Sequence, residues 1–194
     1  MTKIENILTD SIPIVTAKDL KDSGFNRYAI SKYLDGNVLQ KLSHGKYFLQ
    51  GNPPDEFFSI QSRSEKIVFS HSTALYLLNM SDRVPLVYDV TVPQGYNVKR
   101  ISRDFPSTNF FYTKPELWDL GIQTVETPFG FQIRVYDKER TILDIVKNKK
   151  RVDNQIFIQS IKEYFNSNKN LRKLLKYSKV MNMEDKIRTY IEIL

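Results

Sequence analysis

Ser70, His71 and Ser72 are the residues whose types most resemble a catalytic nucleophile with its base. A serine becomes a strong nucleophile when a histidine removes its proton and an acidic residue orients that histidine. We do not expect this chemistry here, because adjacent residues are poorly placed to form such a pair and no glycine elbow surrounds the serine. Ser70 is instead expected to cap a helix, and His71 to be a buried polar residue with a partner.

Carboxylates in the middle of the chain are the second candidates for chemistry. Acid–base catalysis needs a proton donor and acceptor held in a defined geometry. The central carboxylates show no spacing that identifies such a pair, so an enzyme is the weakest interpretation. They are Asp89, Asp104, Asp137 and Glu139.

Cysteine is absent, and His44 and His71 are the two histidines of the chain. These counts exclude disulfides and thiolate catalysis and leave too few ligands for most zinc sites. The sequence therefore predicts neither a metal nor a cofactor.

A group of polar and basic residues near the N-terminus has the types and spacing of a DNA-binding surface. Arginine and lysine contact phosphates and guanine edges, and asparagine and serine also contact base edges. We expect these residues to lie on one face of a helix and on the hairpin that follows it. They are Asn26, Arg27, Tyr28, Ser31, Lys32, Lys41, His44 and Lys46.

The elements that position this surface can be predicted from local signals. Thr16 can cap a short helix over residues 17–22, and Ser23-Gly24 ends it. Asn26 can cap a second helix that runs to about Asp35, with Ile30 and Leu34 facing the first helix.

A hairpin completes the predicted N-terminal domain. The runs 38–42 and 46–49 are typical of strands joined by a short turn, and apolar spacing within residues 1–10 indicates one more helix. Two helices across a tight turn, followed by a hairpin, predict a winged helix-turn-helix over residues 1–52.

Composition and charge limit the class of protein. The chain has 194 residues, of which 41% are hydrophobic, with 11 Tyr and 12 Phe, so it can build a real core. Lys and Arg number 7 against 5 Asp and Glu in residues 1–52, 10 against 12 in 53–146, and 12 against 5 in 147–194. The surplus of the C-terminal quarter suits nucleic acid or another acidic partner. No apolar run approaches the length of a membrane span and no signal-peptide core is present, so we expect a cytoplasmic protein without membrane contact.

A larger mixed α/β domain is predicted over residues 53–194, after a boundary at Gly51-Asn52-Pro53-Pro54. A helix is expected over 55–67, a capped helix after Ser70, and strands over 85–91, 109–112, 121–125 and 131–136 in an antiparallel or mixed sheet. The overall prediction is an α+β chain with a small sheet and a C-terminal helical bundle.

The helical bundle is predicted from apolar stripes after residue 137. Asp137 can cap the first helix, whose Arg140 is expected to pair with an acid on the sheet or with a partner's carboxylate. Three helices follow near 153–166, 169–180 and 184–193, with Asn168 or Asn170 and then Asn182 as caps. A possible auxiliary basic surface comprises Lys147, Lys149, Lys150, Arg151, Lys169, Arg172, Lys173, Lys176 and Lys179.

Four stretches of the sequence resemble the AbiEi family, the antitoxins of type IV abortive-infection systems. Two are general features of winged domains, Val15 to Leu20 and Gly45-Lys46-Tyr47. The other two are more specific, FSHSTALYL over 69–77 and VYDKERTILD over 135–144, and the four together extend over nearly the whole chain. The family-motif residues singled out here are Ser70, His71, Thr73, Glu139, Arg140 and Thr141.

The resemblance implies a protein with two activities. The winged domain of the family binds inverted repeats in its own promoter and represses the operon. This sequence is equally compatible with a monomer on each repeat and with a preformed dimer on DNA. The C-terminal domain counters a nucleotidyltransferase-like toxin, AbiEii, without forming a stable complex. A transcriptional regulator whose C-terminal domain senses a ligand is the alternative.

Overall fold

The computed structural model describes residues 14–50, 55–167 and 169–193. The helix expected within residues 1–10 and the boundary expected at 51–54 lie outside these ranges. Within them the chain is a mixed α+β protein with ten α-helices and two small sheets. It divides into two compact units. The N-terminal unit comprises the described residues up to Arg63 together with Thr127–Phe131. The C-terminal unit comprises Ser64–Glu126 and the residues from Gln132 onward.

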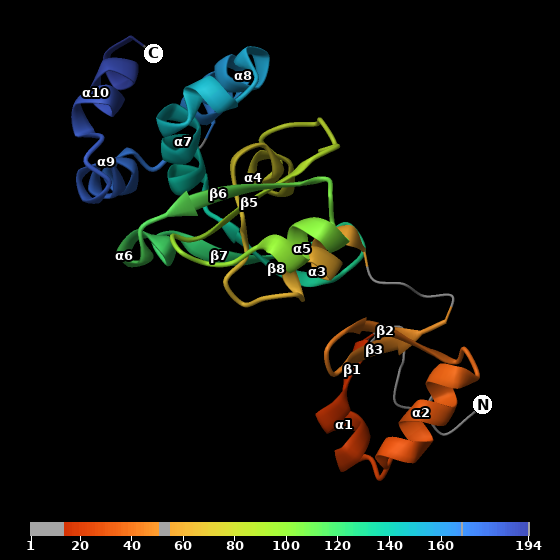
Figure 1. The fold of residues 1–194 in the computed structure, drawn as a ribbon. Helices are drawn as coiled ribbons and strands as arrows, with labels where there is room; N and C mark the ends of the chain where they lie inside the picture. The colour runs from red at the N-terminus through yellow and green to blue at the C-terminus, as the bar shows by residue number, and fades with distance from the viewer. Residues whose placement is uncertain (1–13, 51–54, 168, 194) are drawn as a thin grey trace. The chain divides into compact units, whose positions relative to one another are not determined.

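The N-terminal unit contains the two helices and the hairpin that the sequence predicts. Figure 1 shows α1 and α2 on one side of its three-stranded antiparallel sheet, whose order is β1-β3-β2. Strand β1 was not predicted, because three residues show no periodicity and their pairing depends on the distant β3. The elements are β1 (Ile14–Thr16), α1 (Ala17–Asp22), α2 (Arg27–Asp35), β2 (Leu39–Ser43), β3 (Lys46–Leu49) and α3 (Glu56–Gln61).

Both predicted caps of this unit are confirmed. The Asp19 amide donates to Thr16 Oγ1 at 3.1 Å, while the Thr16 amide donates to the Asp19 carboxylate at 2.9 Å, which completes a capping box. Asn26 Oδ1 accepts from the Ala29 amide at 2.8 Å at the start of α2. These bonds join residues three apart, so the local sequence determines them.

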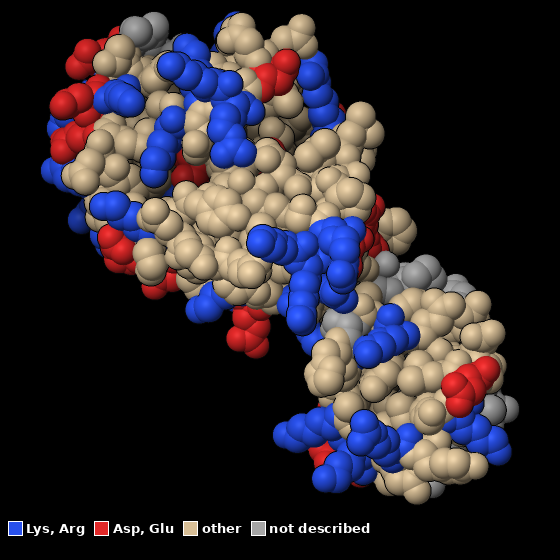
Figure 2. All heavy atoms as spheres, in the orientation of Figure 1, with Lys and Arg blue, Asp and Glu red and all other residues tan. Residues whose placement is uncertain are grey.

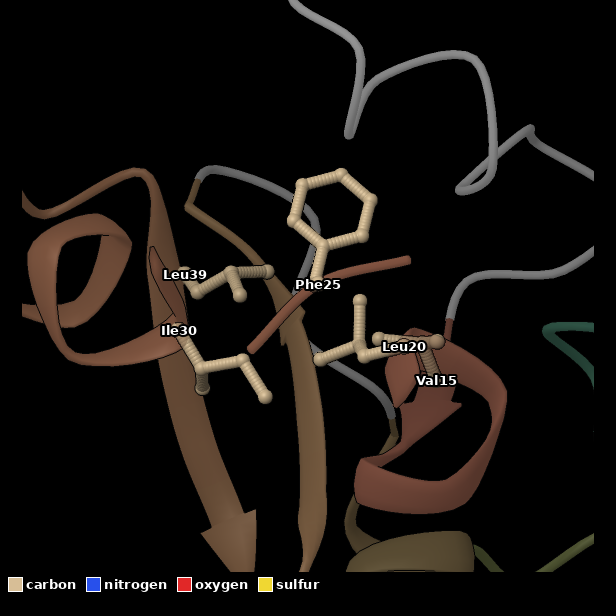
Figure 3. Packing of buried hydrophobic residues seen from close by; sticks show 5 residues of the cluster. All are labelled: Val15, Leu20, Phe25, Ile30 and Leu39. Atoms are coloured by element: carbon tan, nitrogen blue, oxygen red, sulfur yellow. The ribbon is translucent and has the colours of Figure 1, made fainter. Parts of the chain in front are cut away.

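Five buried residues form the core of the N-terminal unit, and Figure 3 shows them converging from both helices and the sheet. Val15 comes from β1, Leu20 from α1, Ile30 from α2 and Leu39 from β2, with Phe25 in the turn between the helices. Removing such side chains from water is the main favourable term in folding, so this cluster fixes how α1, α2 and the sheet pack together.

Helix α3 is shorter than the predicted helix over 55–67, which is wrong beyond Gln61. The Ser62 hydroxyl donates to the Ser59 carbonyl at 2.9 Å, and Ser64 Oγ accepts from the Lys66 amide at 3.0 Å. Serine side chains that bond to the backbone in this way compete with a helix, which explains the early end.

The sheet of the C-terminal unit has five strands in the order β6-β5-β4-β8-β7. It is mixed, since β5 pairs parallel with β6 and β4 parallel with β8, while the other two pairs are antiparallel. Its strands are β4 (Val68–Phe69), β5 (Tyr88–Pro93), β6 (Thr108–Thr113), β7 (Ile122–Glu126) and β8 (Gln132–Tyr136).

Strand β5 begins later than the predicted strand over 85–91. Leu86 is 90% exposed and lies before the strand, whereas Asp89, Val90, Thr91 and Val92 are all buried. A strand with neighbours on both edges and covered faces is buried at successive positions, so the alternation inferred around Leu86 does not apply.

Helices cover this sheet and extend away from it. Figure 1 shows α4 and α7 on one side of the sheet, with α8, α9 and α10 beyond α7. Helices α5 and α6 were not predicted, because one or two turns give too little periodicity. The helical elements are α4 (His71–Leu77), α5 (Lys99–Asp104), α6 (Pro115–Trp118), α7 (Lys138–Lys147), the 3₁₀ turn η1 (Lys149–Arg151), α8 (Asn154–Asn166), α9 (Leu171–Val180) and α10 (Glu184–Ile193).

Asn182 ends α9 and does not cap α10. It has a φ of 55°, its amide donates to the Lys179 carbonyl, and the Met183 amide donates to the Ser178 carbonyl. This pair of bonds is a Schellman motif, which asparagine suits because it tolerates the left-handed conformation. Asn170 does cap α9, with Oδ1 accepting from the Lys173 amide at 3.0 Å, and Asn168 lies outside the described residues.

In the described parts of the chain, no helix has the length and apolar character needed to cross a membrane.

Candidate functional site

The outer face of α2 carries the residues expected to contact DNA. Asn26, Arg27, Tyr28, Ser31 and Lys32 are all exposed, and Tyr28 is 78% accessible to solvent. Ile30 on the opposite face is buried in the core. The amphipathic pattern thus leaves a polar face on α2, although Asn26 uses its carbonyl oxygen to cap the helix and retains only its amide nitrogen as a free donor.

A hollow of about 740 Å³ brings α1, the start of α2 and the β2–β3 hairpin together. Arg27 lines it from α2, while Lys41 and His44 line it from the hairpin. Lys21 of α1 lines it too, and sequence reasoning missed this residue because α1 was treated only as a support. Figure 2 shows lysine and arginine side chains gathered where α1 and α2 meet.

The other expected contacts lie elsewhere on the unit. Tyr28, Ser31 and Lys32 do not line this hollow, and Lys46 is partly buried in β3. The structure therefore brings Asn26, Arg27, Lys41 and His44 together at one concave surface, with the remaining polar residues of α2 exposed beside it.

The FSHSTALYL motif forms the joint between β4, α4 and β5. Ser70 occupies the N-cap position of α4, as predicted, but its side chain forms no cap hydrogen bond. The carboxylate of Asp89 takes this place, because its Oδ2 accepts from the Ser72 amide at 3.1 Å. Thr73 Oγ1 accepts from the Asp89 amide at 2.8 Å, which secures the same joint.

Ser70 and His71 do form a hydrogen bond, contrary to the expectation for adjacent residues. His71 has a φ of 47°, and its Nδ1 lies 2.9 Å from Ser70 Oγ. The Thr91 hydroxyl also lies 2.9 Å from Ser70 Oγ. Both side chains are enclosed, with 0% and 1% exposure, so the pair has no access to a substrate and does not resemble a working nucleophile.

The His71 ring is held between two parts of the unit. Its Nε2 accepts from the Asn148 side-chain amide at 3.0 Å, and amide nitrogens only donate, so Nδ1 carries the proton and donates to Ser70. The ring stacks on Phe111 with 3.5 Å between centroids. Burial, followed by the positive charges of Arg151, Arg140 and Lys147, lowers the pKa of His71 from 6.5 to about 3.

The VYDKERTILD motif forms a second buried joint, centred on Arg140. The Arg140 guanidinium is fully buried, pairs with Asp144 at 3.0 Å and lies over the Tyr136 ring. It also donates to the carbonyls of Leu117 and Leu120. The acid is therefore on the same helix and not on the sheet, because residues four apart on a helix are neighbours.

Asp137 and Glu139 also bind within the fold. Asp137 caps α7 by accepting from the Arg140 amide at 2.8 Å, as predicted. The Lys173 ammonium lies 3.0 Å from Asp137 and 3.3 Å from Glu139. Burial alone would lower the pKa of Lys173, but these two carboxylates outweigh it and raise that pKa. Lys173 is thus not a free cation of the auxiliary basic surface.

The remaining motif residue and the other carboxylates have structural partners as well. Thr141 Oγ1 donates to the Tyr136 carbonyl at 3.3 Å. Asp89 accepts from Asn109 at 3.0 Å, and its burial raises its pKa. Asp104 pairs with the neighbouring Arg103 at 3.1 Å. Asp89 and Asp104 therefore lie apart with separate partners, while Asp137 and Glu139 share the Lys173 ammonium.

The other auxiliary basic residues fall into two exposed groups. Lys147, Lys149, Lys150 and Arg151 lie at the end of α7 and on η1, and the second group lies on and just before α9. Arg172, Lys176 and Lys179 of the second group have the i, i+4, i+7 spacing of one helix face. Lys169 is exposed at the start of this group and donates to the Phe165 carbonyl.

Comparisons with known proteins add information on the fold. No family model matches the chain, and no curated protein matches it. Among solved structures it is similar to the crystal structure of the RV2827C protein from Mycobacterium tuberculosis, with a TM-score of 0.59 at 11% sequence identity. The match covers 86% of this chain and 66% of that one, so this chain spans slightly less than two thirds of that protein's length. At this identity the likeness concerns the fold alone.

Protonation of His71 should weaken the C-terminal unit in acid. Because its pKa is about 3 when folded and 6.5 ordinarily, the unfolded chain binds more protons between these values. The stability contributed by the neutral ring is complete above pH 6.5 and is lost as the pH falls below it. Between pH 7 and pH 5 the free energy of unfolding should fall by about 2 kcal/mol more in the native chain than in His71→Asn.

Urea unfolding followed by the fluorescence of Trp118, the single tryptophan, measures this difference. Asparagine is a suitable replacement because it tolerates a positive φ. Burial raises the pKa of Asp89 and Asp144. The contribution of these two carboxyl groups to stability therefore rises as the pH falls, opposite to that of His71, but both proteins contain these groups and the effect cancels in the difference. An identical loss of stability in the two proteins would show that His71 does not titrate as described.

Gly121 should resist substitution more strongly than Gly95, although both have a positive φ. A Cβ at Gly121 would lie 2.9 Å from the Arg140 Cβ and 3.1 Å from the Tyr177 ring, whereas a Cβ at Gly95 has no atom within 4 Å. Gly95→Ala should cost about 1 kcal/mol from backbone strain, and Gly121→Ala about 2 kcal/mol more from the clash. Equal losses in urea unfolding would contradict the close packing at Arg140.

Proposed function

We propose that the N-terminal unit is a winged helix-turn-helix that binds duplex DNA, and that the chain is a cytoplasmic repressor of its own operon. The observation that carries this proposal is the arrangement of Arg27, Lys41 and His44 around one hollow. A helix and a hairpin that present donors to the same concave surface suit a duplex, because the helix can enter the major groove while the hairpin follows the backbone.

In this arrangement α2 reads the bases and the hairpin positions the unit. Arg27 stands in the first turn of α2, which is where recognition helices contact base edges, and Tyr28 beside it is 78% exposed. Lys41 and His44 would contact phosphates next to the site, as would Lys46. Asn26 would contribute through its amide nitrogen, since its oxygen caps the helix. The operator is an inverted repeat, bound by one unit per half-site.

The second part of the proposal is an antitoxin function against a nucleotidyltransferase-like toxin, without a stable complex. Its support is the AbiEi-like FSHSTALYL and VYDKERTILD motifs, whose residues form the two buried joints of the C-terminal unit. Because these motif residues are buried, the surface that acts on the toxin lies outside them. The exposed cations of α9 are the candidates: Arg172, Lys176 and Lys179.

DNA binding can be tested by fluorescence anisotropy with the chain's own upstream DNA and a scrambled duplex over a range of salt concentrations. Arg27→Ala should weaken binding to the native duplex by about 1–3 kcal/mol and change binding to the scrambled duplex much less, because a base contact is lost. Arg100→Ala is the matched control, since it removes an equal charge from an exposed site on α5. Equal weakening of both duplexes by Arg27→Ala would show that Arg27 contacts only phosphate.

The antitoxin function can be tested by growth rescue, with an AbiEii-like nucleotidyltransferase toxin expressed from an independent promoter. The triple variant Arg172→Ala, Lys176→Ala, Lys179→Ala should lose rescue, because it removes the positive stripe of α9. Arg27→Ala should retain rescue, because repression of the operon no longer matters. The control Lys99→Ala, Arg100→Ala, Lys114→Ala removes as many exposed charges elsewhere. Full rescue by the α9 variant would refute a role for this face.

A further inference from the structure

A second hollow, of about 830 Å³, lies within the C-terminal unit between the end of α7, η1 and α10. Five of its lining residues are cations, and none is an aspartate or a glutamate. Figure 2 shows lysine and arginine side chains gathered over α7 and the neighbouring helices. The hollow is lined by Val146, Lys147, Asn148, Lys149, Lys150, Arg151, Lys186, Thr189 and Tyr190.

Buried aromatic rings fix two of these cations in place. The Arg151 guanidinium lies 4.1 Å from the centroid of Phe111 and donates to Asn109 at 3.1 Å. The Lys149 ammonium lies 4.7 Å from the centroid of Phe157. Cation–π contacts of this kind hold the charges near the hollow before any ligand arrives, which lowers the entropic cost of binding.

The same Phe157 ring supports the aromatic wall of the hollow. Tyr190 packs edge-to-face against Phe157, with 6.0 Å between centroids, and lines the hollow from α10. One buried ring thus positions both a cation and an aromatic face. The hollow thereby offers positive charge and a flat apolar surface.

The arrangement of charge is not explained by the fold alone. Cations near the end of α7, such as Lys147, interact favourably with the negative end of the helix dipole. Lys186 gains no such stabilisation, because it lies in the first turn of α10, where the helix dipole disfavours positive charge. Five like charges around one space repel each other, and a polyanion would relieve that repulsion.

We propose that this hollow binds a nucleoside triphosphate. Its volume lies within the range of small-ligand sites. The phosphates would be held by Lys150, Arg151 and Lys186, and the base would lie against the Tyr190 ring, which provides the flat contact that an inorganic polyphosphate does not need. A concave site with one aromatic wall fits a free nucleotide better than a continuous DNA backbone, so nucleic acid is the alternative for the experiment to detect.

Isothermal titration calorimetry of the full chain with ATP, inorganic tripolyphosphate and a short DNA duplex tests the proposal. Lys150→Ala with Lys186→Ala should weaken ATP binding by about tenfold or more, because two phosphate contacts are lost. Lys99→Ala with Lys162→Ala removes two exposed charges outside the hollow and should leave ATP binding nearly unchanged. Tyr190→Leu should weaken ATP binding but not tripolyphosphate binding.

Several results would overturn the proposal. Absence of saturable ATP binding at millimolar concentration would reject it, as would equal weakening by the control pair, which would reflect net charge alone. If Lys150→Ala with Lys186→Ala lost duplex binding, and ATP did not compete with the duplex in the native chain, the hollow would be assigned to the DNA backbone. Equal weakening of ATP and tripolyphosphate by Tyr190→Leu would remove the nucleoside from the proposal. Thermal unfolding of each variant verifies that the fold is retained.

Discussion

The hydrogen bond from the Asn148 side chain to His71 holds together two segments of the C-terminal unit that lie 77 residues apart. It requires a neutral imidazole, because Nε2 must accept while Nδ1 donates to Ser70. Burial and the nearby charges of Arg151, Arg140 and Lys147 keep the ring neutral by lowering its pKa. Lys147 and Arg151, which line the surface hollow, therefore also help to preserve this buried hydrogen bond.

Short-range hydrogen bonds are the part of this fold that the sequence predicts well. The caps at Thr16, Asn26 and Asp137 join residues three apart, so residue type and spacing identify them. Ser70 occupies the predicted N-cap position, but the oxygen that accepts from the first turn of α4 belongs to Asp89 of β5, which the local sequence does not identify. Asn182 fails because asparagine can either begin or end a helix, and only the backbone conformation distinguishes the two.

For the candidate DNA surface too, the sequence predicts the features that depend on local residues and misses those that depend on packing. The exposed face of α2 follows from the positions of Ile30 and Leu34, because a helix that buries one face presents the opposite one. The hollow could not be predicted, since Lys21, Arg27 and Lys41 converge only once α1, α2 and the hairpin have packed around Phe25 and its neighbours. Sequence reasoning also counted Lys173 as a surface cation, because its carboxylate partners lie more than thirty residues away.

The AbiEi-like motifs are more specific in sequence than any other stretch, yet their polar residues are used within the fold. Arg140 binds Asp144 and two carbonyls, and Thr73 binds the backbone of Asp89. Leaving a buried charge or hydrogen-bond donor unpaired destabilises the fold by more than its hydrogen bond stabilises it, so each of these residues depends on its partner. Exposed cations such as Lys150 and Lys186 have no such requirement, because water solvates them. Exposed cations, both around the hollow and on α9, are therefore free to bind a ligand or a partner, and the activities proposed for this unit depend on them and not on the motif residues.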